Sequence, residues 1–325
     1  MTAKDNATAP RPVTPRSSPA TGAGLLLGCL GILAFSFSFP SAKLALDGFD
    51  PWLIAVGRAA VAGVLAAAYL HAVRAPRPTR RQAVRLAIVA GGVIIGFPVF
   101  TTLALVSTDA AHGAVVIAVL PAATALAAVA RAGERPRPAF WLAAGAGLAI
   151  VLAFVLHEAS GALTAADAYL LAGTALCALG YAEGGALARE MTGPQTISWA
   201  LVLSLPLTIP VTVLVTVLAP PDAADAAAWF GFGYQALISM FLGFFAWYAG
   251  LARGGVARIG QVQLSQPLLT VLWSALVLGE ALSPVLLLAG IGVLACVAAT
   301  QRARVAVRPP RTPRAASREP ARARP

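Results

Sequence analysis

Charged residues are scarce in this chain of 325 residues: Asp, Glu, Lys and Arg make up 11% of it, whereas 58% is hydrophobic. The mean hydropathy is +0.79. A soluble protein of this length needs far more charge to cover its surface. Apolar runs of about 20 residues recur along most of the chain, and each can cross a hydrocarbon core of roughly 30 Å. The composition therefore excludes an ordinary soluble protein and predicts a polytopic membrane protein.

Residues that build metal centres and enzyme sites are also few. The three cysteines, Cys29, Cys177 and Cys296, lie inside apolar runs, without metal-ligand spacing or a disulfide pattern. The sequence contains no phosphate-binding loop and no nucleophile with a base at a suitable spacing. We therefore expect no enzymatic activity, no cofactor and no metal site.

The balance of charge is basic, with a formal net charge of +11. Such an excess can indicate nucleic-acid binding, but here the basic residues occupy short loops and tails between apolar segments. The polar residues 1–21 and the Arg- and Pro-rich residues 302–325 are expected to be disordered cytoplasmic tails. The second tail could contact anionic lipid, or it could only reinforce the membrane topology.

Ten apolar segments separated by short loops predict ten transmembrane helices. With the N-terminus in the cytoplasm, every Lys and Arg except Lys43 and Arg58 falls on the cytoplasmic side, as the positive-inside rule requires. Both termini of this multi-pass cell-membrane protein are therefore expected in the cytoplasm. The predicted spans are residues 22–45, 52–73, 83–105, 110–131, 138–157, 167–188, 196–218, 229–252, 257–279 and 284–301.

A pattern of proline, Gly-Glu and proline occurs twice in the chain. It spans residues 121–138 and recurs in residues 267–284, so that Pro121 becomes Pro267 when 146 is added. Because each half then holds five spans, an odd number, the second copy must enter the membrane upside down. Inverted repeats let two similar halves exchange conformations and so open a cavity to alternate sides. The repeat therefore predicts a secondary transporter, with Glu134 facing the cytoplasm and Glu280 the outside.

Three stretches carry a family resemblance: FPSAKLALDGFDPWLIAVGRAAVAG, PAATALAAVARAGERP and QPLLTVLWSALVLGEALSPVLLLAGIGVLA. Over about residues 22–301 the sequence resembles the EamA-like branch of the drug/metabolite transporter superfamily. The resemblance implies two five-helix repeats, at 22–157 and 167–301, around a central cavity. It also implies export or uptake of small metabolites, and it leaves the substrate open because members handle amino acids, other metabolites and drugs.

Pro121 and Pro267 are expected about ten residues inside their helices. A proline there frees a backbone carbonyl and kinks the helix. We interpret both as hinges of cavity-lining helices, since bent helices in matching halves often mark a transport site; static kinking for packing is the alternative.

Glu134 and Glu280 resemble functional carboxylates but are better explained as structural residues. Each lies at the end of a span, beside a glycine and just before a helix that begins with proline. There the carboxylate can bind backbone N–H groups at the N-terminus of the next helix. We therefore expect both to stabilise the turn between paired helices.

Glu183 and Arg58 are the ionisable residues that we expect deepest in the membrane, where charge is costly and usually faces water or a partner. Glu183 is a candidate for substrate binding and proton coupling; the alternative is an acid paired with Arg253 or Arg258. Arg58 could bind a substrate carboxylate through two parallel hydrogen bonds. It could equally pair with Asp47 or Asp50, or extend toward the interface.

A polar stripe is expected on the ninth span, where Gln263, Gln266, Thr270 and Ser274 share one helical face. Its amides could bind a neutral polar or zwitterionic ligand, or could form interhelical hydrogen bonds. Aromatic side chains could line the same cavity, or could serve packing and lipid contact. The candidates are Trp273, Trp247 and Tyr248.

The sequence thus predicts a secondary transporter that exports a small metabolite, an amino acid or similar amphiphile, across the cytoplasmic membrane by alternating access. Export is favoured by the family resemblance rather than by chemistry. The alternatives are lipid translocation, and a non-transporting sensor or scaffold with the same fold. A lipid mover should have a polar groove open to the bilayer, whereas a metabolite carrier should enclose its polar residues. The expected partners are the bilayer and a small-molecule substrate, not nucleic acid; the oligomeric state stays open.

Overall fold

The computed structural model describes residues 19–132, 138–158, 163–188, 190–221, 224–254 and 262–304. Within these ranges all regular elements are helical and no strand occurs. The first half contains α1 (Pro19–Ser36), α2 (Ser38–Leu46), the π-helix η1 (Leu53–Gly57), α3 (Arg58–Ala72), α4 (Arg80–Val89), the π-helix η2 (Ala90–Gly96), α5 (Phe97–Leu105), α6 (Ala110–Ile117), α7 (Leu120–Ala132) and α8 (Pro138–Glu158). The second half contains α9 (Ala165–Leu187), α10 (Gly193–Leu218), α11 (Ala226–Gly233), the π-helix η3 (Tyr234–Leu242), α12 (Gly243–Gly254), the 3-10 helix η4 (Val262–Ser265), α14 (Gln266–Leu278) and α15 (Pro284–Arg304).

Seven helical stretches in the described residues are long and apolar enough to cross a membrane. Three shorter apolar helices accompany them, at Ala110–Thr124, Val262–Leu278 and Pro284–Ala299. The first of these contains a turn at Ala118 and Val119, which separates α6 from α7. The predicted all-helical fold is thus found, and α15 (Pro284–Arg304) is one continuous helix over the predicted span 284–301, whereas ten membrane-crossing helices are not established by length and composition. The seven long stretches are Gly22–Leu46, Leu53–Ala72, Arg80–Leu105, Pro138–His157, Ala165–Leu187, Gly193–Leu218 and Ala226–Gly250.

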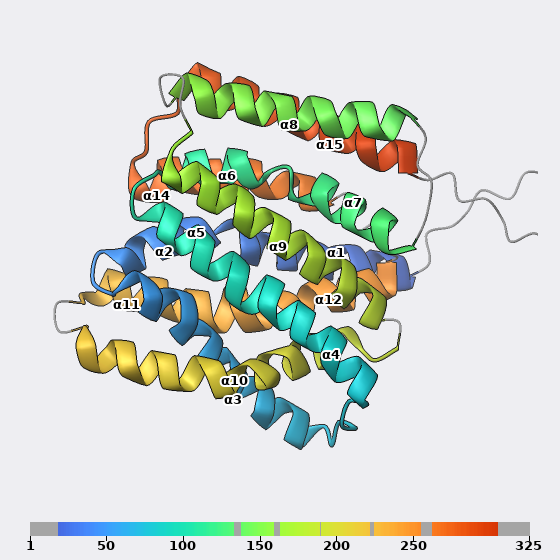
Figure 1. Cartoon of the computed structure of the whole chain (residues 1–325), viewed down its shortest axis with the longest axis vertical. Coiled ribbons are helices and arrows are strands. Elements are labelled where there is room, and N and C mark those ends of the chain that lie inside the picture. Colours follow the sequence, from blue (N-terminus) through green and yellow to red (C-terminus); the bar gives the residue numbers. More distant parts are fainter. Residues whose placement is uncertain are drawn as a thin grey trace, which may run out of the picture.

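The helix contacts have a two-fold pattern: a contact made by a helix of the first half has a counterpart made by the matching helix of the second half (Figure 1). α8 packs against α15 at one end of the molecule, and α3 packs against α10 at the opposite end. Between these pairs, α14 packs against α6. α1 packs against α12, and in the matching position of the other half α9 packs against α4, η2 and α5. Each of these pairs therefore joins a helix of the first half to a helix of the second.

Several helix ends follow signals that are visible in the sequence. Thr79, Thr164 and Thr192 each accept a hydrogen bond from the backbone N–H three residues later, and the side chain of that later residue accepts one in return. These reciprocal caps satisfy N–H groups that a helix start leaves unpaired. At the other kind of end, α14 stops at Gly279, whose φ of 69° is left-handed and is tolerated because glycine has no Cβ.

Apolar side chains cover the outside of the bundle, and polar ones lie within it. Leu142 on α8, Leu218 on α10 and Leu288 on α15 are 74%, 74% and 70% exposed. Lipid can cover such side chains where water would not. Arg58 and Gln235, by contrast, are buried. This distribution suits a bilayer and directs attention to the interior.

Candidate functional site

A cavity of about 60 Å³ lies in the interior, with walls from both halves of the chain. Arg58 and Thr102 line it from the first half, and Tyr181, Ser239 and Thr270 line it from the second. Because helices from both halves meet there, a change in their packing would change the cavity directly. This is the arrangement expected of a transport site between repeats.

Arg58 is the one charged side chain among the described residues of this wall. It begins α3 directly after the π-helix η1, and π-turns of this kind often occur at functional sites. Arg58 is 6% exposed, its Nη1 donates a hydrogen bond to Gln235 Oε1, and its Nε has no hydrogen-bond partner. No ion pair found in the described residues includes it. The cation is therefore buried without a counter-ion in the part of the chain that the structure describes.

The two acids that the sequence offered as partners of Arg58 are not bonded to it. Asp50 accepts a hydrogen bond from the backbone N–H of Trp52 at 2.8 Å. Asp47 is exposed at the end of α2. The interpretation of Arg58 as part of an outer ion pair with either acid is therefore wrong, because both carboxylates lie on the connection after α2 rather than in the interior.

Gln235 on η3 holds the guanidinium of Arg58 in place. It is fully buried, and its Nε2 donates hydrogen bonds to the carbonyl oxygen of Ser38 and to Ser41 Oγ, the latter at 2.9 Å. With its amide nitrogen engaged on α2, its oxygen is directed at Arg58. The hydroxyls of Ser38 and Ser239 share a further hydrogen bond of 2.7 Å. Sequence reasoning missed Gln235, although a lone amide within an apolar run was the available signal.

Aromatic and hydroxyl groups complete the cavity. Phe35 and Phe244 lie against one another with ring centroids 4.8 Å apart, and both line the wall. Thr270 on α14 donates its hydroxyl to the carbonyl oxygen of Ser36 at 2.7 Å. The cavity therefore has one cationic end and a largely apolar remainder.

Two residues of the predicted polar stripe line this cavity, and a third borders a smaller space beside it. Gln266 and Thr270 line the cavity together with Arg58. Both also line an adjoining space of about 20 Å³, which is bordered by Gln263 and by the prolines Pro121 and Pro267. The structure thus brings Arg58, Gln266 and Thr270 together and places Gln263 beside them.

The sequence had suggested that Pro121 and Pro267 lie inside continuous helices. In the structure each proline lies at the start of a helix instead. Pro121 is the second residue of α7, after the break that ends α6, and Pro267 is the second residue of α14. A proline at the start of a helix loses no hydrogen bond, because the first N–H groups have no intrahelical partner. The expected position about ten residues inside a helix is wrong for both, because each proline follows a break within its apolar stretch, and the hinge role stays a prediction.

The predicted aromatic residues lie outside the walls of the cavity. Trp273 donates its indole N–H to Ser36 Oγ at 3.0 Å. Trp247 is buried against Gly31, where an added Cβ would approach the tryptophan backbone to 2.9 Å. Tyr248 is buried against Gly193 in the same way. These side chains pack helices together, and a direct substrate contact by any of them is untested.

Glu183 is buried on α9 and forms an ion pair with Arg85 of α4, with 3.3 Å between its Oε2 and the arginine Nε. Arg85 also binds Glu190, which is largely exposed and lies beyond the end of α9. This hydrogen bond from Arg85 lowers the pKa of the Glu190 carboxyl. The sequence had suggested Arg253 or Arg258 as the alternative partner of Glu183; an ion pair with Arg85 is found, and Arg258 lies outside the described residues. Glu183 does not line the central cavity.

Glu280 binds a helix N-terminus, but not that of the next helix. Its two carboxylate oxygens accept hydrogen bonds of 2.8 Å each from the backbone N–H groups of Ala110 and Ala111, at the start of α6. The following helix, α15, is capped by Ser283 instead. The expected chemistry is therefore found on a helix of the other half, and Glu134 lies outside the described residues.

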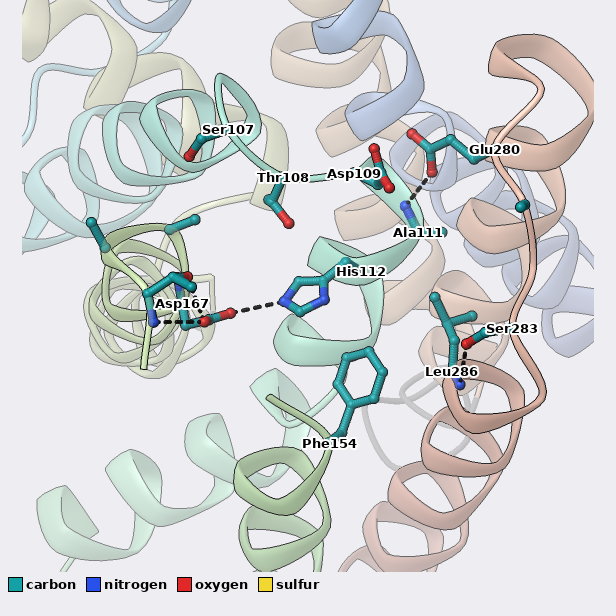
Figure 2. Close-up of a pocket in the computed structure, with 14 residues that line it drawn as sticks. Ser107, Thr108, Asp109, Ala111, His112, Phe154, Asp167, Glu280, Ser283 and Leu286 are labelled. Carbon is teal, nitrogen blue, oxygen red and sulfur yellow. Dashed lines mark hydrogen bonds and ion pairs between the residues drawn. The ribbon is translucent and has the colours of Figure 1, made fainter. Parts of the chain in front are cut away.

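A second hollow, of about 490 Å³, lies where α6 and α9 begin. Figure 2 shows His112 pointing toward Asp167 and Glu280 reaching the start of α6. His112 Nε2 lies 2.8 Å from Asp167 Oδ1, and Asp167 also binds the backbone N–H and hydroxyl of Thr164. Each of these three side chains is engaged with a protein partner.

Comparison with known proteins agrees with this architecture. The profile of the EamA-like transporter family matches the chain twice, over residues 22–156 and 164–300. A protein of Bacillus subtilis (strain 168) named "Uncharacterized transporter YdeK" is 45% identical over 282 residues, which are 86% of this chain and 97% of the relative. One solved crystal structure is similar in fold, with a TM-score of 0.59 and 21% identity over 86% of this chain and 98% of its own. The two family matches cover most of the chain, so this membrane transporter belongs to the EamA-like transporter family.

Proposed function

We propose that this protein is a secondary transporter that moves a small metabolite, an amino acid or a similar amphiphile, out of the cell by alternating access. The observation that carries the proposal is the interior cavity, which both halves line and which holds the buried cation of Arg58. Enclosed polar groups favour a metabolite carrier over a lipid mover, which needs a polar groove open to the bilayer. The outward direction rests on the family resemblance.

Alternating access requires two similar halves of opposite orientation. We place these halves at residues 22–157 and 167–301, each with five membrane-crossing segments, and both termini in the cytoplasm. The two-fold pattern of helix contacts supports this arrangement. The three shorter apolar helices then also cross the membrane, with Pro121 and Pro267 as the hinges of the two helices that meet beside the cavity.

The substrate contacts in this proposal are centred on Arg58, Gln266 and Thr270, which line the cavity. Gln263 borders the adjoining space and would meet the substrate as the helices move. Trp273, Trp247 and Tyr248 lie behind the first layer of wall residues and would form contacts in another conformation. Glu134 keeps its role in stabilising the turn between paired helices, whereas Glu280 stabilises the start of α6.

Proton coupling through Glu183 is the remaining part of the proposal. A proton on Glu183 would weaken its bond to Arg85, which would then be held by Glu190 alone. Because these residues join α4 to α9, and so one half to the other, such a change could favour one conformation over another.

The test uses proteoliposomes with a trapped pH dye, challenged with pools of amino acids, related amphiphiles and cationic drugs, while labelled versions are followed in parallel. Substrate-dependent proton movement that Glu183→Gln abolishes and Glu190→Gln retains would support transport and coupling. Labelled flux without proton movement, or an unchanged pH profile in Glu183→Gln, would refute the coupling. Silence in both measurements with folded protein would contradict the transporter proposal and favour the lipid or scaffold alternatives.

A further inference from the structure

On the basis of the proposed transport function, we infer that the substrate is a small organic monoanion: a carboxylate with an apolar body and no free ammonium group, bound through Arg58. This narrows the class of small amphiphiles, because an amino acid and its deaminated relative both belong to it but carry different charges. Three properties of the cavity lead to it: an uncompensated cation, a fixed donor geometry, and described walls without acidic side chains.

The first property is the charge of Arg58. Guanidinium remains protonated under all physiological conditions, and a charge removed from water is unfavourable unless an opposite charge or several hydrogen bonds compensate it. In the described residues Arg58 has a single side-chain acceptor, the neutral amide of Gln235, and its Nε is buried without a partner. A bound carboxylate would supply both the missing charge and the missing acceptor. One cation matches one negative charge, which favours a monoanion.

The second property is the fixed orientation of the guanidinium. Gln235 is anchored by the carbonyl of Ser38 and the hydroxyl of Ser41, and it engages Nη1 of Arg58. With one nitrogen held, the planar group can turn little, and its remaining donors keep their positions. Arginine in this state is suited to a planar carboxylate, which it can bind through two parallel hydrogen bonds.

The third property is the lack of a site for an ammonium group. None of the described residues that line the cavity is acidic. The buried acids of the described chain are engaged elsewhere: Asp167 with His112 and Thr164, and Glu183 with Arg85. An ammonium group in the cavity would therefore lose its hydration without gaining a counter-charge, beside a cation that repels it. A zwitterion should bind much less well than the corresponding acid without nitrogen.

The remaining walls indicate the body of the ligand. Phe35, Phe39, Phe97 and Phe244 line the cavity together with Met240, and the volume is about 60 Å³. Such walls suit a small apolar group. Because ligand pockets usually measure about 300 Å³ or more, the cavity has to widen to admit the whole ligand. The hydroxyls of Ser239 and Thr102 could bind one neutral oxygen atom next to the carboxylate.

The test compares three labelled probes that share an isobutyl group, in counterflow with the full-length protein in proteoliposomes. The probes are 4-methyl-2-oxopentanoate, which has the carboxylate without the ammonium, leucine, which has both, and 3-methylbutylamine, which has only the ammonium. We expect flux of the oxo acid to exceed that of leucine by about tenfold or more, with no carrier-dependent flux of the amine. Equal or faster flux of leucine would overturn the inference while leaving the transport function intact. Absence of carrier-dependent flux for all three probes and for the wider pools would contradict the transport function itself.

Variants of Arg58 test whether this residue determines the preference for the carboxylate probe. Arg58→Gln should lose flux of the oxo acid, Arg58→Lys should retain a part of it because the charge persists without the fork, and the exposed Arg77→Gln should behave as wild type. Monodisperse elution and thermal unfolding of each variant in detergent separate loss of binding from loss of fold. If flux of the oxo acid is unchanged in a folded Arg58→Gln protein, Arg58 is not the residue that binds the carboxylate. The comparison of the three probes uses the wild-type protein and does not depend on any variant.

Discussion

Arg58 and Arg85 are two buried arginines of the same half, 6% and 8% exposed, with opposite surroundings. Arg85 bridges two carboxylates, Glu183 and Glu190. Arg58 has a glutamine as its side-chain partner and lines a cavity. A paired arginine is complete within the fold, whereas an arginine balanced only by neutral groups can still accept an anion. The presence or absence of a carboxylate partner therefore distinguishes a structural arginine from a binding-site arginine, whereas the exposed fractions of the two side chains do not.

The most severe test of this contrast gives Arg58 the carboxylate that it lacks. Gln235→Glu would place a carboxylate where the amide oxygen now accepts from Arg58. The internal ion pair should compete with any anionic substrate by about 3 kcal/mol, or roughly 100-fold in transport efficiency. The measurement is the concentration dependence of labelled flux in proteoliposomes. Gln195→Glu, at a capping position on the start of α10, is the matched control and should transport normally.

The next test removes each arginine in turn and compares the stability of the fold. Arg85→Met removes the ion pair with the buried Glu183 and should lower the free energy of unfolding by about 3 kcal/mol. Arg58→Met leaves no described carboxylate behind, so it should cost much less or even stabilise the protein. Denaturation in mild detergent, followed by intrinsic tryptophan fluorescence, measures both. Equal losses in the two variants would show that the two arginines do not differ in the way described.

A smaller effect is expected at Glu280, where a carboxylate is satisfied by a helix end rather than by a cation. In Glu280→Gln one of the two acceptor oxygens becomes an NH₂ group, and the negative charge at the start of α6 is lost. The unfolding free energy should fall by about 1–2 kcal/mol. Thermal unfolding in detergent can detect this change. Ser283→Ala, which removes the cap of α15, serves as a comparison for a helix start without a charged cap.

The smallest effect is expected at Glu190, the exposed partner of Arg85. The hydrogen bond from Arg85 holds its pKa below the ordinary value of 4.5. A carboxyl with a lowered pKa stabilises the fold above its unfolded-state pKa and loses that contribution as the pH falls through the folded-state value. Glu190→Gln should therefore be slightly less stable than wild type at pH 7, and the difference should vanish once the pH has fallen through the lowered folded-state pKa. A difference that grows on acidification would contradict this assignment.

Sequence reasoning identified Arg58, Gln266 and Thr270, all of which reach the cavity, because intramembrane polar residues are few and each one requires an explanation. It did not identify Gln235, since a single amide in an apolar run has no periodic partner in the sequence. It also assigned Glu280 to the wrong helix. Local spacing favoured the next helix along the chain, whereas the start of α6, 170 residues away, is the one that lies within reach.

The membrane class and the repeat within the chain could be inferred from the sequence alone, because hydropathy and a pattern shifted by 146 positions are local properties of the chain. The partners of the buried charges were decided only by the tertiary structure. Arg85 meets Glu183 across 98 positions of sequence, and Arg58 meets Gln235 across 177. Such pairings depend on how helices of the two halves pack, and no spacing within one helix encodes them. Because these pairings depend on packing, only the tertiary structure shows that Arg58, unlike Arg85, has no carboxylate partner among the described residues.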